Sequence, residues 1–204
     1  MTTRASESEV LEESDRRPRW RVVDILVASV VAVAGGAVFA VWNTAAAPLM
    51  NAMVPPLSAF YVGVWLFPGV LGALIVRKPG AAVYTELVAA TVEALIGSSW
   101  GFSTVYYGLL EGLGAEVVFL VFLYRRWGVT VAALAGAGAG VAAGLLDVFV
   151  YYPTITAAAK LGYVGLTIVS GLVVAGLASW LLVRALARTG VLASFASGRD
   201  AERV

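Results

Sequence analysis

The chain has 204 residues, of which 60% are hydrophobic and only 13% are charged, and its formal net charge is +1. Soluble domains carry about 25% charged residues, so this composition predicts a membrane protein. The sequence contains no cysteine and no histidine. Their absence excludes disulfides, thiol chemistry, Cys/His metal sites and histidine general bases.

The first 21 residues differ from everything that follows. Residues 1–15 place five acidic side chains among Ser and Thr, and an arginine-rich run follows at 16–21. We interpret residues 1–21 as a disordered cytoplasmic tail that ends in a positively charged anchor. A cleaved signal peptide is the competing interpretation, because Ala45-Ala46-Ala47 resembles a cleavage site. The apolar stretch before that site is longer than a signal-peptide core, which disfavours this alternative.

Six apolar stretches follow, each long enough to cross a hydrocarbon core of about 30 Å as a helix. They comprise residues 22–43, 57–76, 80–98, 105–124, 129–150 and 163–185. The sequence therefore predicts an all-α polytopic membrane protein with six transmembrane helices in a single bundle. The bundle is expected to occupy residues 22–187, and residues 188–204 are expected to form a short cytoplasmic tail.

The basic residues are distributed asymmetrically along these stretches. When the stretches are threaded through a bilayer, thirteen of the fourteen Lys and Arg residues fall on one side and only Lys160 falls on the other. Short loops rich in Lys and Arg stay in the cytoplasm. We therefore predict a protein of the bacterial cytoplasmic membrane with both termini inside. Its outer loops would be 44–56, 99–104 and 151–162, and the apolar loop 44–56 would cover part of the bundle.

The first helix carries small residues at four-residue spacing, namely Ala28, Ala32 and Gly36. Such a stripe allows another helix to approach closely. It indicates either a lipid-accessible docking surface for a partner subunit or packing within the chain. The stripe Gly136, Gly140 and Gly144 in the fifth helix leaves the same two alternatives open.

Five acidic residues lie inside the third, fourth and fifth predicted spans, at Glu86, Glu93, Glu111, Glu116 and Asp147. A charged residue at the centre of a spanning helix costs about 2.5–3.5 kcal/mol on insertion scales, so such residues face the bundle interior and usually mark function. Glu86 and Glu93 are two turns apart and share one helix face. The sequence offers no Lys or Arg at these depths. The cluster therefore favours a ligand that is cationic or rich in N–H donors, although some of these acids could instead be protonated or capped by hydroxyl groups.

Polar and aromatic residues accompany the acids, namely Asn43, Tyr61, Trp65, Tyr84 and Tyr106. A carboxylate accepts hydrogen bonds from an aminopyrimidine, and a Trp or Tyr face stacks on an aromatic ring or a cation. The pattern predicts that a small, positively charged aromatic base binds in the outer half, under loop 44–56. The alternative for the aromatic residues is an interfacial belt.

Four segments spread along the chain form a further pattern. They are 77–82 (Arg-Lys-Pro-Gly-Ala-Ala) with 86–90 (Glu-Leu-Val-Ala-Ala) and Glu93, then 112–116 (Gly-Leu-Gly-Ala-Glu), Asp147 with the aromatic residues after it, and 189–192 (Thr-Gly-Val-Leu). Together they resemble the YkoE-type substrate-binding (S) components of energy-coupling-factor (ECF) transporters, over residues 20–198. Glu86, Glu93, Glu116 and Asp147 match these motifs.

The resemblance implies a membrane subunit that captures thiamine or its hydroxymethylpyrimidine precursor from outside. It also implies partners, namely one transmembrane scaffold subunit and two ATPase domains, and it favours the docking interpretation of Ala28, Ala32 and Gly36. We expect Glu93 and Glu116 to contact the pyrimidine or balance the ligand's charge, and Trp65 and a tyrosine to stack on a ring.

No phosphate-binding loop and no enzyme signature are present in the sequence, so a capture subunit of this kind needs a partner to drive transport. The prediction is a subunit that is not an enzyme and that needs no cofactor. The alternative is a self-sufficient proton- or cation-coupled secondary transporter in which the glutamates relay protons, although no matching pair of broken helices is evident. A membrane enzyme is disfavoured by the missing His and Cys residues.

Overall fold

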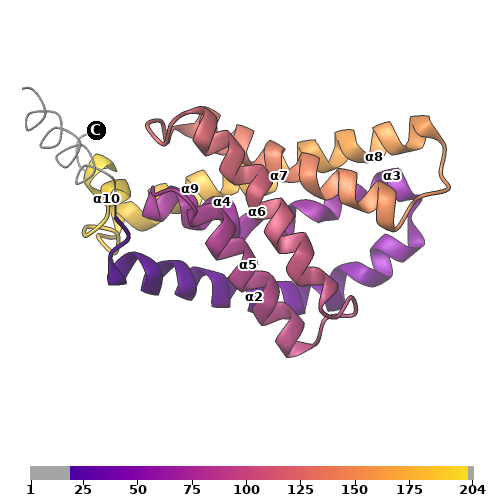
Figure 1. The fold of residues 1–204 in the computed structure, drawn as a ribbon, viewed down its shortest axis with the longest axis horizontal. Helices are drawn as coiled ribbons and strands as arrows, with labels where there is room; N and C mark the ends of the chain where they lie inside the picture. Colours follow the sequence, from indigo (N-terminus) through magenta and orange to yellow (C-terminus); the bar gives the residue numbers. More distant parts are fainter. Residues whose placement is uncertain (1–18, 202–204) are drawn as a thin grey trace, which may run out of the picture.

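A computed structural model describes residues 19–201, and no strand occurs among them. Figure 1 shows an elongated helical bundle in which some of the longer helices run roughly along the long axis and others cross it obliquely. The elements in chain order are α2 (Val22–Ala52), α3 (Pro55–Ser58), the 3-10 helix η1 (Ala59–Val64), α4 (Phe67–Val76), α5 (Ala81–Gly97), α6 (Ser103–Val121), α7 (Val129–Val150), α8 (Ala157–Ser170), the π-helix η2 (Gly171–Leu177), α9 (Ala178–Arg188) and α10 (Ala196–Ala201). The predicted disordered tail lies almost wholly outside the described residues.

Five helical segments of the described chain are long and apolar enough to cross a membrane. They are Val22–Ala46, Pro55–Val76, Ser103–Val121, Val129–Val150 and Ala157–Arg188. The prediction of an all-α membrane protein is thus confirmed. The predicted third span coincides with α5, which has 17 residues and carries two glutamates. The count of six spans therefore depends on α5.

Two spans depart from regular α-helix. The second contains α3, the 3-10 helix η1 and then α4, which leaves η1 tightly wound beside α8. The last contains the π-helix η2 between α8 and α9. Ser170 joins the two irregular segments, because its Oγ donates to the Phe60 carbonyl oxygen at 2.6 Å and accepts from the Gly63 N–H at 3.0 Å. π-Helical turns are rare and frequently occur near functional sites.

The expected loop at 44–56 is mostly helical, so this part of the prediction is wrong. α2 continues through Pro48 to Ala52. Proline removes one backbone hydrogen bond, but the alanines at 45–47 have the highest helix propensity of any residue and keep the helix intact around it. The extension brings Met50 over the interior of the bundle, where it contributes to a cavity described below.

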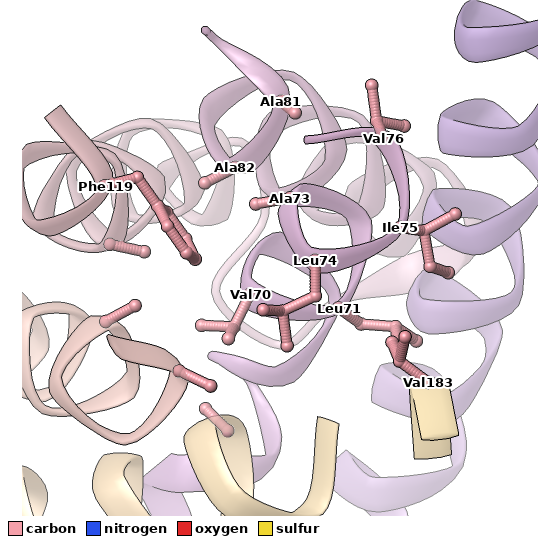
Figure 2. Close-up of a cluster of buried hydrophobic side chains, with 14 of the residues drawn as sticks. Val70, Leu71, Ala73, Leu74, Ile75, Val76, Ala81, Ala82, Phe119 and Val183 are labelled. Carbon is pink, nitrogen blue, oxygen red and sulfur yellow. The ribbon is translucent and has the colours of Figure 1, made fainter. Parts of the chain in front are cut away.

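The helix α4 lies at the centre of the bundle. Residues Pro68 to Val76 are all buried, and Figure 2 shows Val70, Leu71 and Leu74 on this helix, with Phe119 and Val183 on neighbouring helices of the same cluster. A helix that is apolar on every side must be surrounded by other helices. α4 is therefore the central helix of the bundle, and the other helices pack around it.

Basic residues from separate turns meet at one end of the bundle. Lys78 and Arg21 both form ion pairs with the fully buried Asp24, with Arg21 Nη2 2.9 Å from Asp24 Oδ1. Arg77 lies 5.9 Å from the centre of the Trp127 ring. The start of α2, the end of α9 and α10 lie at this end, on the left in Figure 1, whereas α3 and the start of α8 lie at the opposite end.

Candidate ligand-binding site

A cavity of about 430 Å³ lies between the helices, and residues from α2, η1, α5, α6, α7 and α8 contribute to its wall. Among the described residues, no Lys or Arg lines it. The lining residues are Phe39, Met50, Val62, Trp65, Glu86, Ala90, Glu93, Ser99, Trp100, Thr104, Tyr107, Glu111, Asp147, Tyr151, Tyr152 and Tyr163. The wall therefore contains four carboxyl groups and seven aromatic side chains, which make the cavity acidic and rich in aromatic surface.

The structure brings four of the five predicted acids together. Glu86 and Glu93 project from α5, Glu111 from α6 and Asp147 from α7, and each is less than a tenth exposed. Buried carboxyl groups without a neighbouring cation have a strong electrostatic need for a positive charge or a proton. The cavity therefore suits a ligand that brings positive charge or N–H donors.

Glu86 is the least exposed of these four acids, with 1% of its surface accessible. Its Oε2 accepts a hydrogen bond of 2.6 Å from the backbone N–H of Gly69. Gly69 stands in the first turn of α4, where N–H groups have no partner within the helix. The Oε1 atom of Glu86 is buried and accepts no hydrogen bond from any described residue. One side of this carboxyl group is thus fixed and the other is available to a ligand.

Glu93 belongs to a chain of hydrogen bonds that joins three parts of the wall. Its Oε1 accepts from Asn43 Nδ2 at 2.6 Å and from Ser98 Oγ at 3.2 Å. The Oδ1 of Asn43 in turn accepts from Trp65 Nε1 at 3.0 Å. Asn43 does not line the cavity. Its two hydrogen bonds orient the Glu93 carboxyl group and the Trp65 indole ring, which do line it.

Aromatic rings pack edge to face along one side of the cavity. The Trp65 ring centre lies 5.9 Å from that of Trp100, with an angle of 85° between the planes. On another side, Tyr107 stacks on Tyr151 at 5.8 Å, and Tyr163 donates from its hydroxyl group to Asp147 Oδ2 at 2.7 Å. These arrangements leave ring faces and edges available to a flat, cationic ligand.

Several residues of the cavity wall are not among those predicted from the sequence. Trp100, Tyr151 and Tyr152 lie in or beside turns between helices, so they suggested an interfacial belt. Tyr107 stands one helical turn before Glu111 on the same face, a spacing that was available in the sequence. Tyr163 also lies near a predicted span boundary and was interpreted as part of the same belt, and Thr104 has no distinguishing feature in the sequence.

Glu116 lies away from the cavity, contrary to the prediction that it contacts the ligand there. Its carboxylate accepts from the backbone N–H groups of Gly80 and Ala82 at 2.6 and 2.9 Å, and from the Tyr124 hydroxyl group at 2.8 Å. These N–H groups belong to the start of α5, at the end where the basic residues gather. The first N–H groups of a helix have no acceptor within the helix. The carboxylate of Glu116, on the neighbouring helix α6, provides an acceptor for those of α5.

The three predicted tyrosines also lie outside the wall. The Tyr84 hydroxyl group is 2.6 Å from Ser29 Oγ, and its ring contacts Trp20 near the basic end. Tyr106 is 71% exposed. Tyr61 packs against Trp42 with 5.9 Å between ring centres. Trp65 is thus the one aromatic residue of the predicted set that reaches the cavity.

The small residues of the first helix are not on an accessible stripe, so the expectation of a free docking face there is wrong. Ala28 and Ala32 have no exposed surface, and Gly36 is buried. A Cβ atom on Gly36 would lie 2.7 Å from the Ala89 carbonyl oxygen of α5. The stripe packs inside the bundle because small side chains let α2 approach α5. The glycines of α7 do the same, since a Cβ atom on Gly140 would overlap the Thr167 carbonyl group of α8.

The chain is similar to known membrane transport proteins. A family model described as the permease component of an ABC-type cobalt transport system matches residues 23–142. A protein of Bacillus subtilis (strain 168) named as a putative HMP/thiamine permease protein, YkoE, is 32% identical over 185 residues, which are 90% of this chain and 93% of that protein.

A solved structure extends the similarity to the whole fold. The crystal structure of an S-component of an ECF transporter superposes with a TM-score of 0.87 at 32% identity, over 91% of this chain and 94% of that one. The sequence identity and the fold agree over nine-tenths of the chain. The chain therefore belongs to the substrate-binding S components of ECF transporters, multi-pass membrane proteins that are not enzymes.

Proposed function

We propose that this S component captures thiamine or hydroxymethylpyrimidine from outside the cell for import. The observation that carries the proposal is the composition of the cavity wall, in which four carboxyl groups face tryptophan and tyrosine rings and no described Lys or Arg opposes them. The Bacillus subtilis relative is named for the same pair of solutes.

The chemistry of these solutes matches the wall. An aminopyrimidine offers N–H donors to a carboxylate, and the thiazolium ring of thiamine is a flat cation that an indole or phenol face attracts. A volume of about 430 Å³ is within the range of pockets that enclose small molecules. A phosphate group would meet four carboxyl groups and no described Lys or Arg, so we expect thiamine to bind more tightly than thiamine monophosphate.

The proposed topology has six crossings, with α5 as the third. Its 17 residues span about 25 Å at 1.5 Å per residue, enough to cross most of the hydrocarbon core. The basic end then faces the cytoplasm together with both termini, and the turn after α5, which carries Ser99 and Trp100 of the cavity wall, faces outward. A transmembrane scaffold subunit and two ATPase domains would supply the energy for import.

Cobalt, which the matching family model mentions, has less support as the substrate. The sequence lacks histidine and cysteine. Within residues 19–201, no three Asp or Glu side chains converge on a point where they could hold a metal ion. Carboxylate, imidazole and thiolate groups are the ligands that such a site would need.

Thermal unfolding of the purified subunit tests the proposal. A ligand that binds only the folded state stabilises it by RT ln(1 + [L]/Kd), or about 2.7 kcal/mol at a hundredfold excess over Kd. We expect thiamine and hydroxymethylpyrimidine to raise the midpoint of unfolding, and thiamine monophosphate to raise it less. A larger shift with thiamine monophosphate than with thiamine, or no shift with either proposed solute, would overturn the proposal.

A further inference from the structure

Two carboxyl groups of the cavity have oxygen atoms that accept no hydrogen bond from the described residues. Asp147 accepts from Tyr163, and Glu93 accepts from Asn43 and Ser98. Glu111 is 6% exposed, lines the cavity and accepts no hydrogen bond from any described residue. Glu86 presents its buried Oε1 atom in the same unpartnered state.

These two side chains lie on helices that approach each other closely. A Cβ atom added to Gly112 of α6 would lie 3.1 Å from the Glu86 Cβ atom, and one added to Gly108 would lie 3.1 Å from the Glu86 carbonyl oxygen. Glu111 immediately precedes Gly112 on α6, and Glu86 and Glu111 both line the same cavity. The glycines therefore let α5 and α6 pack closely where Glu86 and Glu111 line the same cavity.

The surroundings of this pair contain no cation among the described residues. The other titratable groups that line the cavity are Glu93 from α5, Asp147 from α7, and the tyrosines Tyr107, Tyr151, Tyr152 and Tyr163. The carboxyl groups add negative charge, and the phenol groups are neutral at physiological pH. The Gly69 N–H group at the start of α4 supplies a partial positive charge to Glu86 alone.

Two buried carboxylates in contact with one cavity cannot both ionise without a compensating charge, because their repulsion is poorly screened away from water. We propose that Glu86 and Glu111 retain a shared proton in the empty protein, and that entry of a cationic ligand expels it. The inference rests on the proposed function for the ligand's place in this cavity. The exchange balances, since the ligand brings one positive charge and the proton carries one away to the solvent.

This exchange makes the affinity for a cation depend on pH. If one proton leaves for each ligand that binds, the dissociation constant falls about tenfold for each unit by which the pH rises, until the pair is ionised in the empty protein. A neutral ligand brings no charge to replace the proton. Thiamine and hydroxymethylpyrimidine, which share the aminopyrimidine ring, therefore form a matched pair of cationic and neutral probes.

Titration calorimetry on the full chain in detergent counts the released protons. Each probe is titrated at one pH, between about 6 and 7.5, in two buffers that differ in their enthalpy of protonation. We expect thiamine to release close to one proton and hydroxymethylpyrimidine close to none. Thiamine binding with the same heat in both buffers would overturn the inference but leave the proposed function intact. Failure of both probes to bind would overturn both.

Substitutions assign the proton to the pair. Glu111→Gln and Glu86→Gln each remove one of the two like charges, so each should reduce the protons released by thiamine to less than half of the wild-type value. Glu116→Gln is the matched control, because it makes the same chemical change outside the cavity and should leave the proton count unchanged. Thermal unfolding of each variant checks that it is folded. If the Glu86→Gln variant does not fold, the proton count of Glu111→Gln alone tests the assignment. An unchanged proton count in Glu111→Gln would overturn the assignment.

Discussion

Asn43 binds two groups of the cavity wall at once, Glu93 through its Nδ2 atom and Trp65 through its Oδ1 atom. Neither a carboxylate nor an indole ring is held rigidly by its own side-chain torsions, so a shared amide fixes their relative position. A ligand that meets both groups depends on this arrangement, because less conformational entropy is then lost when it binds.

Replacing Asn43 by Leu should weaken thiamine binding. Two hydrogen bonds are lost, one of them to a carboxylate, and such bonds contribute about 1–3 kcal/mol each, so we expect the dissociation constant to rise at least tenfold. Calorimetric titration measures it. Thr44→Val is the control, since Thr44 is exposed and its hydroxyl group, among the described residues, bonds only to the Ala40 carbonyl oxygen. Equal affinities of the two variants would contradict a positioning role for Asn43.

Glu93→Gln tests the carboxylate itself. The amide keeps the size of the side chain but removes its negative charge and replaces one acceptor atom with a donor. We expect thiamine to bind roughly ten- to a hundredfold more weakly, which corresponds to about 1.5–3 kcal/mol for a charged hydrogen bond. Unchanged affinity, measured on protein whose unfolding temperature is normal, would remove Glu93 from the site.

The helix α5 is positioned by its neighbours at both ends and along its length. Glu116 of α6 binds the N–H groups at its start, Asn43 of α2 binds Glu93 near its end, and the glycines of α6 fit against its middle. Because α5 carries both Glu86 and Glu93, the contacts with Asn43 and with the α6 glycines determine where two carboxyl groups of the cavity lie.

Glu116→Gln should affect stability and leave ligand binding unchanged. Loss of a charged acceptor at a helix start costs about 0.5–2 kcal/mol, so the midpoint of thermal unfolding should fall by a few degrees. The amide oxygen of glutamine can still accept from one N–H group or from the Tyr124 hydroxyl group, which limits the loss. We expect the affinity for thiamine to stay within about twofold of wild type, because the side chain lies outside the cavity. A tenfold loss of affinity without loss of stability would place Glu116 in the binding site after all.

The contact between α5 and α6 should be intolerant of a methyl group. A Cβ atom on Gly108 would lie 2.5 Å from the Ala90 Cβ atom, so Gly108→Ala forces the helices apart and should lower both the unfolding midpoint and the affinity for thiamine. Gly165→Ala is the matched control, because a Cβ atom there meets nothing within 4 Å. Alanine favours a helix over glycine by about 1 kcal/mol, so the control should be neutral or more stable. Equal unfolding midpoints of the two variants would contradict close packing at Gly108.

The two ends of the molecule have opposite characters. One gathers ion pairs and arginine–tryptophan contacts around Asp24 and Trp127, and the cavity with its carboxyl groups and tryptophans lies away from it. Thiol labelling measures the orientation directly, because the native chain has no cysteine. In intact cells, Thr154→Cys should react with a membrane-impermeant reagent, and Arg126→Cys should react only after permeabilisation. The reverse pattern would invert the proposed topology.

The class of the protein and the acidic character of its cavity can be predicted without knowledge of the fold. Length and apolarity of a segment decide whether it crosses a membrane, and loop charge is counted residue by residue, so both are evident without the neighbouring helices. The acids at Glu86, Glu93, Glu111 and Asp147 were also identifiable, because an acid in an apolar helix is conspicuous wherever the helix packs.

What each polar or small residue contacts could not be predicted in the same way. Glu111 and Glu116 look alike in the sequence, yet one faces the cavity and the other meets the free N–H groups of α5. Ala28, Ala32 and Gly36 form a small-residue stripe that suits a partner helix and a neighbouring helix of the same chain equally well. The direction of a side chain around its helix, and the donors it meets there, depend on how the other helices pack, and this information is distributed over the whole chain.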